Sequence, residues 1–445
     1  MTCEVVVMNR IGVALAADSA VTADVGESAK IRDSGVKLFM LSKYRPVGVM
    51  VYNNSLLLGV SWEIIIKLFR EEFGRQRCNT VAGYAQALID FVQRNTRRFF
   101  PENVEDLYFE QTLEAEFERI SDEISDEWEY VKGGAEKEGE VYERITERAL
   151  TDWQGKENED SPHFDDGLAE SLLSRNSVGF DRAVGRVFAG RPLGDGGVRH
   201  LRAIAKLVVT KAHFVADTMS GLVIAGFGEA EHFPALQHVT IGGVYSGWLK
   251  ARWEPPEQVS EENRSAVIPF GDNEAVTSFL IGVRPELVKW LADAKVYIRE
   301  LPIQTLDAIT GLSVQQRADA EAIVRATSER KADEFGDGVL KECAARAAET
   351  KYAIETLALR ELAHVASTLV GLGSFQKQMS RERETVGGPV DVAVISKGDG
   401  FIWIDRKHYF DKDLNSHFFR NYYENEAAQE EASTDNEDEE VHDGE

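Results

Sequence analysis

The sequence predicts an α+β fold in which two β-sheets lie between layers of helices. Two β-rich segments and a short β-rich segment near the C-terminus are separated by two long helical segments, so the order is strands, helices, strands, helices, strands. This order favours sheets and helices in separate layers over a doubly wound parallel sheet. No internal repeat of fixed period is visible.

The first hundred residues are expected to form two hairpins followed by two helices. The predicted strands are 3–8, 12–18, 36–41 (VKLFML) and 47–53 (VGVMVYN), and Asn9-Arg10-Ile11-Gly12 between the first two is typical of a hairpin turn. Ser61 is a good helix N-cap, and the apolar residues of the following WEIIIKLFREEF have helical spacing. A second helix is expected at about 80–99.

The second half of the chain repeats the change from strands to helices. After an expected helix at 198–214, the predicted strands are 221–226, 237–242, 245–250 and 265–270. The predicted helices are 274–294 and 314–379, with a break near 335–338, and a hairpin of 390–395 with 401–404 closes the fold. The predicted organisation is therefore a first half at 1–101, an acidic helical insertion at 102–197, a second half at 198–420 and a disordered acidic tail at 421–445.

The formal net charge of −26 limits the partners of the protein. Residues 424–445 contain 11 acidic residues and no Lys or Arg, so the rest of the chain still has a net charge of −15. A field of this sign repels phosphate backbones and anionic bilayers, so neither nucleic acid nor a membrane is an expected partner. The tail has too few apolar residues to offset the entropy cost of ordering.

Cysteine usage and hydropathy favour a cytoplasmic protein. Cys3, Cys78 and Cys343 are far apart and show no CxxC spacing, which fits a reducing compartment. No apolar run reaches the roughly 20 residues of a membrane span. The N-terminal residues lack the basic region of a signal peptide and include Asp18. We therefore expect the mature chain to begin at or next to residue 1.

The residue after Met1 is a candidate nucleophile. Methionine aminopeptidases remove Met1 before a small residue, which would give Thr2 a free α-amine beside its own hydroxyl. Such an amine can act as the base for a weak hydroxyl nucleophile, because its ordinary pKa of roughly 7.7–8.0 is close to working pH. A nearby cation lowers this pKa, and a carboxylate can hold the cation in place. Lys37 and Asp18 are candidates for these two roles.

The spacing of these residues resembles the proteasome β-subunit family of N-terminal-nucleophile (Ntn) hydrolases. That family starts with Thr, has an acidic residue sixteen positions later in a V-x-A-A-D-S strand, and places a lysine before an apolar pair in the next strand. Here Asp18 follows Thr2 by sixteen positions within GVALAADSAVTA, and VKLFML contains Lys37. The Met-Thr start is most similar to the bacterial ancestral-β-subunit and heat-shock-locus peptidase relatives. The resemblance implies a four-layer αββα Ntn-hydrolase sandwich with a helical insertion.

The resemblance also implies further site residues. The oxyanion donor would be the backbone amide of Val51 or Tyr52, and Asp272, Thr385 and Gly387 would position the N-terminus. The sequence departs from the family at several places: Val51 or Tyr52 stands where the family has a glycine, and Phe270-Gly271-Asp272 stands where it has Ser-Gly-Ser. Ala20 replaces a basic residue, and Arg383-Glu384-Thr385-Val386-Gly387 replaces an Asp-x-x-Ser-Gly motif of which only the glycine remains.

The implied activity is that of a threonine-type peptidase or amidohydrolase that forms an acyl-enzyme and needs no cofactor. Its implied partners are a peptide or protein substrate, further copies in a homo-oligomer, and a separate ATP-dependent unfoldase. Two alternatives stay open, a non-proteolytic Ntn amidase for a small amide and a catalytically inactive Ntn-fold interaction protein. Cys3 is a rival nucleophile only if two residues are removed, and we expect it to point into the sheet as a small apolar side chain. The nine histidines show no metal-ligand spacing, and no nucleotide-binding motif is present.

Overall fold

The computed structural model describes residues 3–25, 28–32, 35–131, 137–216, 218–379, 387–408, 410 and 413–417. The chain separates into two units, Met1–Ile404 and Asp405–Glu445. In the second unit the described residues include one short 3-10 helix, η1 (Asp413–Asn415). The predicted acidic tail at 421–445 lies outside the described residues. The first unit contains both sheets and the candidate site.

The first sheet contains the start of the chain. Its strands, in spatial order, are β13 (Ser265–Gly271), β1 (Cys3–Asn9), β2 (Gly12–Ala17), β14 (Asp391–Ser396) and β15 (Gly400–Asp405). β1 lies antiparallel to both β2 and β13, with Glu4 opposite Ala17 and Phe270. β14 lies antiparallel to β2, with Asp391 opposite Ala17. The predicted closing hairpin is confirmed, and it pairs with residues of β2 that lie 374 to 384 positions earlier in the chain.

The second sheet is also antiparallel. Its strands, in spatial order, are β11 (Trp248–Trp253), β10 (Ala235–Tyr245), β9 (Ser220–Gly226), β6 (Val47–Asn53) and β5 (Leu38–Met40), and β12 (Glu257–Gln258) also pairs with β10. Two small hairpins lie outside both sheets: β3 (Val21–Val25) with β4 (Ser28–Arg32), and β7 (Leu56–Leu57) with β8 (Val60–Ser61).

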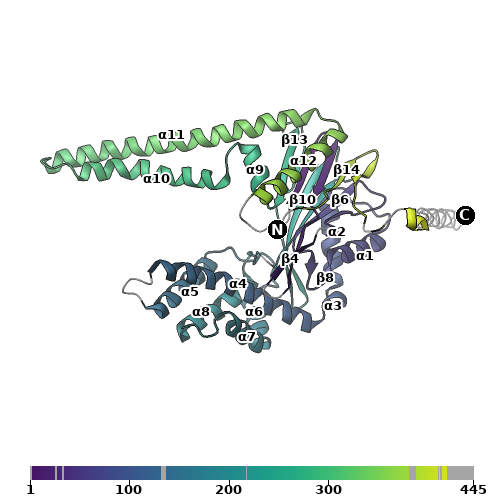
Figure 1. Cartoon of the computed structure of the whole chain (residues 1–445), viewed down its shortest axis with the longest axis horizontal. Coiled ribbons are helices and arrows are strands. Elements are labelled where there is room, and N and C mark those ends of the chain that lie inside the picture. The colour runs from purple at the N-terminus through teal and green to yellow at the C-terminus, as the bar shows by residue number, and fades with distance from the viewer. Residues whose placement is uncertain are drawn as a thin grey trace, which may run out of the picture. The chain divides into compact units, whose positions relative to one another are not determined.

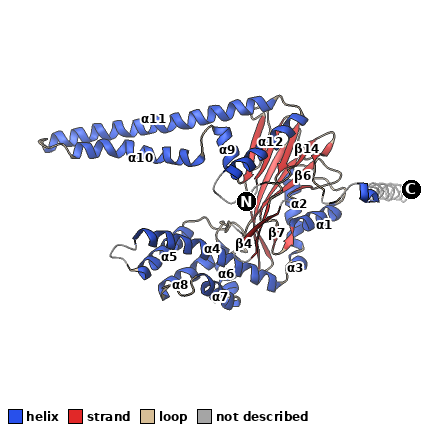
Figure 2. Ribbon diagram, viewed as in Figure 1, coloured by secondary structure: helices blue, strands red, loops and turns tan. Residues whose placement is uncertain are grey.

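Strand alternation creates the layers, because successive side chains of a strand point to opposite faces. Val6 and Met8 of β1 face a buried core shared with Met50 and Val223 of the second sheet. Side chains on the other face of β1 pack on a C-terminal helix, α12 (Leu359–Met379). The outer face of the second sheet packs on α1 (Trp62–Phe73) and α2 (Val81–Arg94). The two sheets therefore face each other across a shared core, and helices pack on their outer faces (Figure 2).

Helices after α2 form a separate block that shares its core with the second sheet. They are α3 (Thr96–Phe99), α4 (Glu102–Val131), α5 (Glu138–Gln154), α6 (Asp166–Arg175), α7 (Ser177–Val187) and α8 (Asp195–Thr210). α4 packs on α5 and α7, and α8 packs on α5 and α6. The buried carboxylate of Glu105 accepts hydrogen bonds from the amide of Gly247, which fixes α4 to the β10–β11 turn. The helical character of 102–197 matches the sequence, and its status as an insertion stays a prediction.

Two predicted boundaries are wrong. The break expected near 335–338 does not occur, because α11 (Val314–Glu355) is continuous through Gly336. A Cβ at Gly336 would lie 2.5 Å from Nζ of Lys295 on α10 (Pro285–Asp307), so this glycine lies beneath the Lys295 side chain inside a continuous helix. The predicted helix at 274–294 instead ends as α9 (Glu274–Ile281) at Gly282, which has φ +78°.

The strands predicted at 237–242 and 245–250 also differ from the structure. β10 continues through both glycines of Gly242-Gly243, and a register shift occurs between Ile241 and Gly243. The turn to β11 lies later, at Ser246-Gly247, where both residues have positive φ. Adjacent glycines therefore form a β-bulge here and not a turn.

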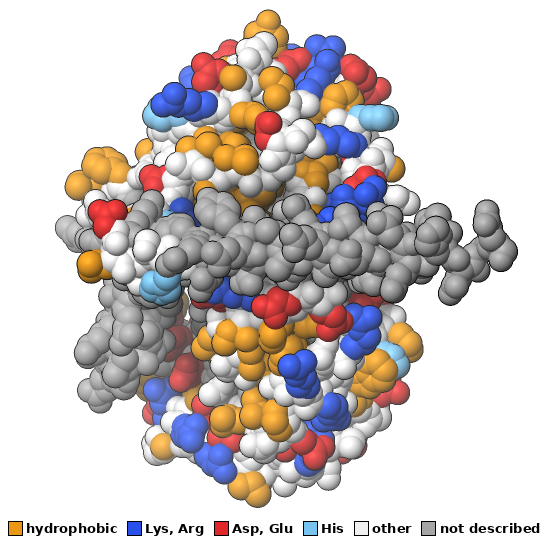
Figure 3. Space-filling model, turned by 90° about the vertical axis from the view of Figure 1, so that its right-hand side faces the viewer, with side chains coloured by type: hydrophobic (Ala, Val, Ile, Leu, Met, Phe, Trp, Pro, Cys, Tyr) orange, Lys and Arg blue, Asp and Glu red, His pale blue; other side chains and the backbone are white. Residues whose placement is uncertain are grey.

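Charged and apolar side chains are interspersed on the face of the molecule in Figure 3. That face carries Lys and Arg beside Asp and Glu, so the net negative charge of the chain does not make it uniformly acidic. In the described part of the chain, no helix is both long enough and apolar enough to cross a membrane.

A buried lysine joins β11 to α8 and generates a prediction about stability. Lys250 Nζ donates to the carbonyl oxygen of Val208 at 2.7 Å, and burial lowers the pKa of Lys250 to about 7 despite the opposing effect of Glu159. The unfolded chain therefore binds more protons between about pH 7 and pH 10, and Lys250 makes the free energy of unfolding rise with pH by up to about 1.4 kcal/mol per unit.

We expect Lys250→Met to remove this rise in urea-unfolding experiments between pH 7 and pH 10. Lys341→Met, on the exposed side of α11, is the matched control and should keep the wild-type slope. Parallel curves for wild type and Lys250→Met would contradict the prediction.

Candidate functional site

The candidate site lies where β2 ends and β5 begins. Asp18 directly follows β2 of the first sheet, and Lys37 directly precedes β5 of the second sheet. Lys37 Nζ lies 2.6 Å from Asp18 Oδ1, and the two side chains are 4% and 0% exposed. The residues that the sequence analysis paired as cation and carboxylate therefore form a buried ion pair that connects the two sheets.

Backbone amides complete the environment of the Asp18 carboxylate. Oδ1 also accepts from the amide of Cys3 at 3.2 Å, and Oδ2 accepts from the amides of Ala20 at 3.3 Å and Gly387 at 3.1 Å. These donors come from β1, from the segment after β2 and from the segment before β14. Together with Lys37 Nζ, these three amides offset the cost of burying the negative charge and fix the orientation of the carboxylate.

The Asp18 carboxylate is thereby tied to the start of β1. The Cys3 amide donates to the same oxygen that binds Lys37, and the Cys3 carbonyl accepts from the Asp18 amide at 3.2 Å. Thr2, the predicted nucleophile, lies outside the described residues. The described geometry thus fixes the residue that follows Thr2 against Asp18 and Lys37.

The predicted oxyanion donors lie within the second sheet. The amide of Val51 donates to the carbonyl oxygen of Lys37 at 2.8 Å, so it is already used, and this prediction is not supported. Strand alternation turns the amide of Tyr52 toward β9, where Tyr52 is opposite Gly221. The strand predicted at 47–53 is observed with the same bounds as β6, and both residues lie within its ladder.

Two of the three predicted positioning residues can be located. Gly387 contacts Asp18 through its amide, and its carbonyl oxygen accepts from the Ser19 amide at 3.1 Å. Asp272 follows β13 and forms an ion pair with Lys377 of α12, with Nζ 2.9 Å from Oδ2. Thr385 lies outside the described residues. Lys377 was not predicted, because a lysine near the end of a helix gives no sign that it is buried.

Glu4 is a second residue that the sequence analysis missed. Its side chain is fully buried, and neither carboxylate oxygen has a hydrogen-bond partner among the described residues. Burial raises the pKa of Glu4 well above its ordinary value, the Lys37 charge lowers it and the Asp18 charge raises it. Glu4 shares a strand face with Val6 and Met8, so a charged residue within CEVVVM was the available signal.

An aromatic group lies beside Glu4 at this end of the sheets. The Tyr52 hydroxyl is 2.8 Å from Nε2 of His238, and both rings pack near Phe270. Burial raises the pKa of Tyr52 to about 12, and the charge of Glu4 acts in the same direction. Burial lowers the pKa of His238. The neutral forms of both side chains are therefore favoured at neutral pH.

The thiol of Cys3 lies on the packed side of the first sheet. It is buried against α12, where a Cβ at Gly373 would lie 2.8 Å from Sγ. Burial, followed by the charges of Asp18 and Asp272, raises the pKa of the thiol. The prediction that Cys3 points into the packed side of the sheet is confirmed.

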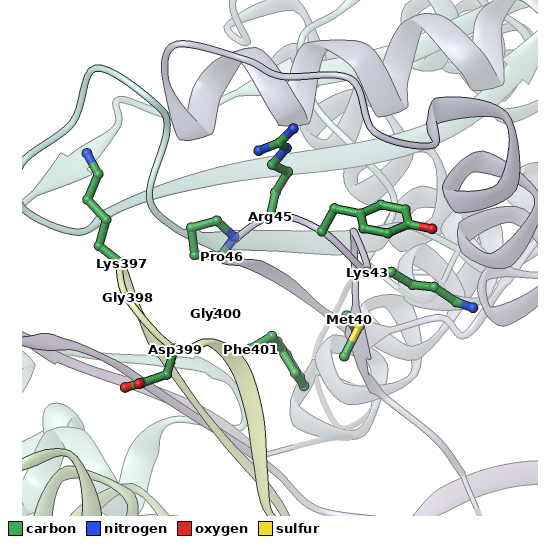
Figure 4. A pocket seen from close by; sticks show the side chains of 10 residues that line it. Met40, Lys43, Arg45, Pro46, Lys397, Gly398, Asp399, Gly400 and Phe401 are labelled. Carbon is green, nitrogen blue, oxygen red and sulfur yellow. The ribbon is translucent and has the colours of Figure 1, made fainter. Parts of the chain in front are cut away.

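An open pocket of about 240 Å³ lies at the other end of the sheets (Figure 4). It is formed by the β5–β6 loop and the β14–β15 turn, which lie opposite the strand ends that carry Lys37 and Asp18. Its basic side chains are already engaged: Arg45 donates to the Arg75 carbonyl at 2.8 Å, and Lys397 donates to the Glu229 carbonyl at 3.1 Å. No group of three or more His, Cys, Asp or Glu side chains among the described residues has the geometry of a metal site.

Comparisons with known proteins give little further information. No protein-family model matches the chain, and no curated protein matches it. Among solved structures the chain is similar to the Anbu (Gly-1) mutant from Hyphomicrobium sp. strain MC1, with 10% sequence identity over 97% of each chain and a TM-score of 0.26. A TM-score this low carries no argument about fold or activity, so the functional argument depends on the site itself.

The Asp18–Lys37 pair generates a prediction about coupling. Lys37→Met leaves a fully buried carboxylate without its cation, and we expect it to lower the free energy of unfolding by about 3–5 kcal/mol. Asp18→Asn/Lys37→Met removes both charges and should cost clearly less than the sum of the single changes in a double-mutant cycle. Additive costs in urea unfolding would show that the two side chains do not interact.

The burial of Glu4 generates a prediction about pH dependence. Because its pKa is raised in the folded state, the folded protein holds a proton that the unfolded chain releases above about pH 4.3. Glu4 therefore makes the free energy of unfolding fall as pH rises, by up to about 1.4 kcal/mol per unit until its folded pKa is reached. We expect Glu4→Gln to remove this fall in urea unfolding between pH 5 and pH 8.

Glu71→Gln, at an exposed position of α1, is the control for this experiment and should follow the wild-type curve. If Glu4→Gln and wild type lose stability equally with rising pH, Glu4 is ionised in the folded protein.

Proposed function

We propose that this protein is a proteasome-like Ntn hydrolase, in which removal of Met1 makes Thr2 the N-terminal nucleophile. The observation that carries the proposal is the double use of Asp18 Oδ1, which accepts from Lys37 Nζ at 2.6 Å and from the Cys3 amide at 3.2 Å. One carboxylate oxygen thus holds a cation beside the first described residue of the chain. The proposed architecture is the four-layer αββα sandwich of that class.

In the proposed reaction the Thr2 hydroxyl oxygen attacks the substrate carbonyl carbon while the Thr2 α-amine accepts the hydroxyl proton. The positive charge of Lys37 lowers the pKa of this amine and keeps it available as a base. Asp18 holds Lys37 in place. Cleavage of the C–N bond releases an amine, which takes up the proton, and leaves an ester on Thr2 that water hydrolyses.

Some of the remaining predicted site residues are kept in the proposal and others are dropped. Gly387 donates its amide to the Asp18 carboxylate, and Asp272 forms an ion pair with Lys377. After burial and the Asp18 charge, the charge of Asp272 also raises the pKa of Cys3. We keep Asp272, Thr385 and Gly387 as positioning residues. Val51 and Tyr52 are dropped as oxyanion donors, because the Val51 amide donates to the Lys37 carbonyl oxygen and the Tyr52 amide faces Gly221 in the β6–β9 ladder.

The proposal extends to the setting of the enzyme. Its substrate would be a peptide or protein in the cytoplasm. The active form would be a homo-oligomer, and a separate ATP-dependent unfoldase would supply it with unfolded substrate. A non-proteolytic amidase that acts on a small amide would also use Thr2, Asp18 and Lys37, but different residues would line its substrate-binding site.

One observation favours a second candidate, an Ntn-fold interaction protein without catalysis. The amide of Val51 donates to Lys37 instead of facing a substrate. A site without an oxyanion donor loses about 10²–10³ in turnover rate. Measurement of acylation distinguishes this candidate from an active hydrolase.

The test begins with the intact mass of the purified full-length protein. We expect the mass of the chain without Met1 and covalent labelling of Thr2 by a β-lactone or epoxyketone probe. Thr2→Ala should abolish labelling, Lys37→Met should slow it at least tenfold, and Cys3→Ser should leave it unchanged. Retention of Met1, or equal labelling of Thr2→Ala, would overturn the proposed mechanism. Turnover of peptides compared with small amides then separates peptidase from amidase.

A further inference from the structure

A long helical hairpin presents a face that no other described element covers. α10 and α11 lie side by side and run away from the sheets (Figure 1). The side of α10 toward α11 is identified by Lys295 and Arg299, whose side-chain nitrogens lie 3.6 Å and 2.9 Å from Asp333 of α11. No described element packs against the opposite side of α10.

A row of large apolar side chains follows this outer side of α10. It consists of Leu287, Trp290, Tyr297 and Leu301, which are 45%, 64%, 71% and 62% exposed. The spacings of three, seven and four residues place all four side chains on one stripe of the helix. At 1.5 Å per residue the row is about 20 Å long, which suits a partner helix of about four turns. Such a contiguous exposed row marks an interaction surface.

A row of acidic side chains runs along one edge of the apolar row. It consists of Glu286, Asp293 and Glu300, which repeat every seven residues and are exposed. None of the three forms an ion pair with a described residue, and Lys295 and Arg299 of the same helix are used by Asp333. The exposed Lys289, one turn from Glu286 and Asp293, offsets one of the three negative charges. The outer face therefore presents apolar side chains beside a row of net negative charge.

This charge pattern selects the kind of partner. If two copies of α10 paired antiparallel through the apolar row, the acidic row of one would meet the acidic row of the other. In a parallel pair the acidic row would meet the row of Arg284, Leu291 and Ile298, which offers a single cation for three carboxylates. A helix with apolar residues flanked by Lys or Arg satisfies both rows. We propose that the outer face of α10 is a docking surface for a basic amphipathic helix of a partner protein.

The test uses the full-length protein and a designed three-heptad peptide. The peptide has Leu at the first and fourth heptad positions, Lys at the flanking positions and a fluorescent label for anisotropy. We expect saturable binding that weakens with salt, and no binding of the same peptide with Glu in place of Lys. Trp290→Ala/Tyr297→Ala should weaken binding at least tenfold, because aromatic anchors dominate such interfaces.

Charge variants separate docking on α10 from general attraction to an acidic protein. Glu286→Lys/Asp293→Lys/Glu300→Lys should also weaken binding at least tenfold. The control Asp122→Lys/Asp126→Lys/Glu147→Lys changes the net charge equally at exposed positions of α4 and α5, and should keep the wild-type affinity within about twofold. The neutral variant Glu286→Gln/Asp293→Asn/Glu300→Gln removes the three negative charges without adding positive ones, and it should also weaken peptide binding. It replaces the charge-reversed variant in the test if that variant does not fold.

Three results would overturn the proposal. Equal weakening by the α10 and control charge variants would show attraction without a defined surface. Equal binding of the Lys and Glu peptides would remove the role of the acidic row. An oligomer in sedimentation experiments that dissociates on Trp290→Ala/Tyr297→Ala would show that a second copy of the chain covers the face.

Discussion

The buried pair of Asp18 and Lys37 is the constraint around which this end of the molecule is arranged. Each residue belongs to a different sheet, so the 2.6 Å contact requires the two sheets to keep a fixed separation and register. A buried ion pair is stable only when its remaining hydrogen-bonding capacity is satisfied. The amides of Cys3, Ala20 and Gly387 supply this for Asp18, and each comes from a different segment.

The same requirement explains why polar groups gather at one end of an otherwise apolar interior. The core between the sheets consists of aliphatic and aromatic side chains such as Val6, Met8 and Met50. Glu4 continues this face of β1 toward Lys37, and it is buried without a hydrogen-bond partner among the described residues. An unpaired carboxyl in that position is costly, and the charge of Lys37 partly offsets the cost. Lys37 therefore influences two carboxyl groups, of which only Asp18 binds it directly.

The outer parts of the molecule serve different physical purposes. The helical block α3–α8 shares its core with the second sheet and is fixed by polar contacts such as Glu105 with Gly247. The α10–α11 hairpin instead leaves large apolar side chains exposed on α10. The first arrangement adds to the core, whereas the second offers a surface. We thus propose separate elements for chemistry and docking, namely the strand ends at Asp18 and Lys37 and the outer face of α10.

Local patterns in the sequence determined the strands around Asp18, the helices α1 and α2 and the closing hairpin, whereas the pairing of Asp18 with Lys37 was inferred from a spacing that resembles a known family. Alternation, helix capping and fixed spacing act over a few residues, so they can be read without the fold. Only the tertiary structure decided that Val51 donates to Lys37, that Lys377 meets Asp272 and that Gly336 packs under Lys295. These contacts join residues that are distant in sequence, and their geometry depends on how sheets and helices pack, which no local pattern encodes.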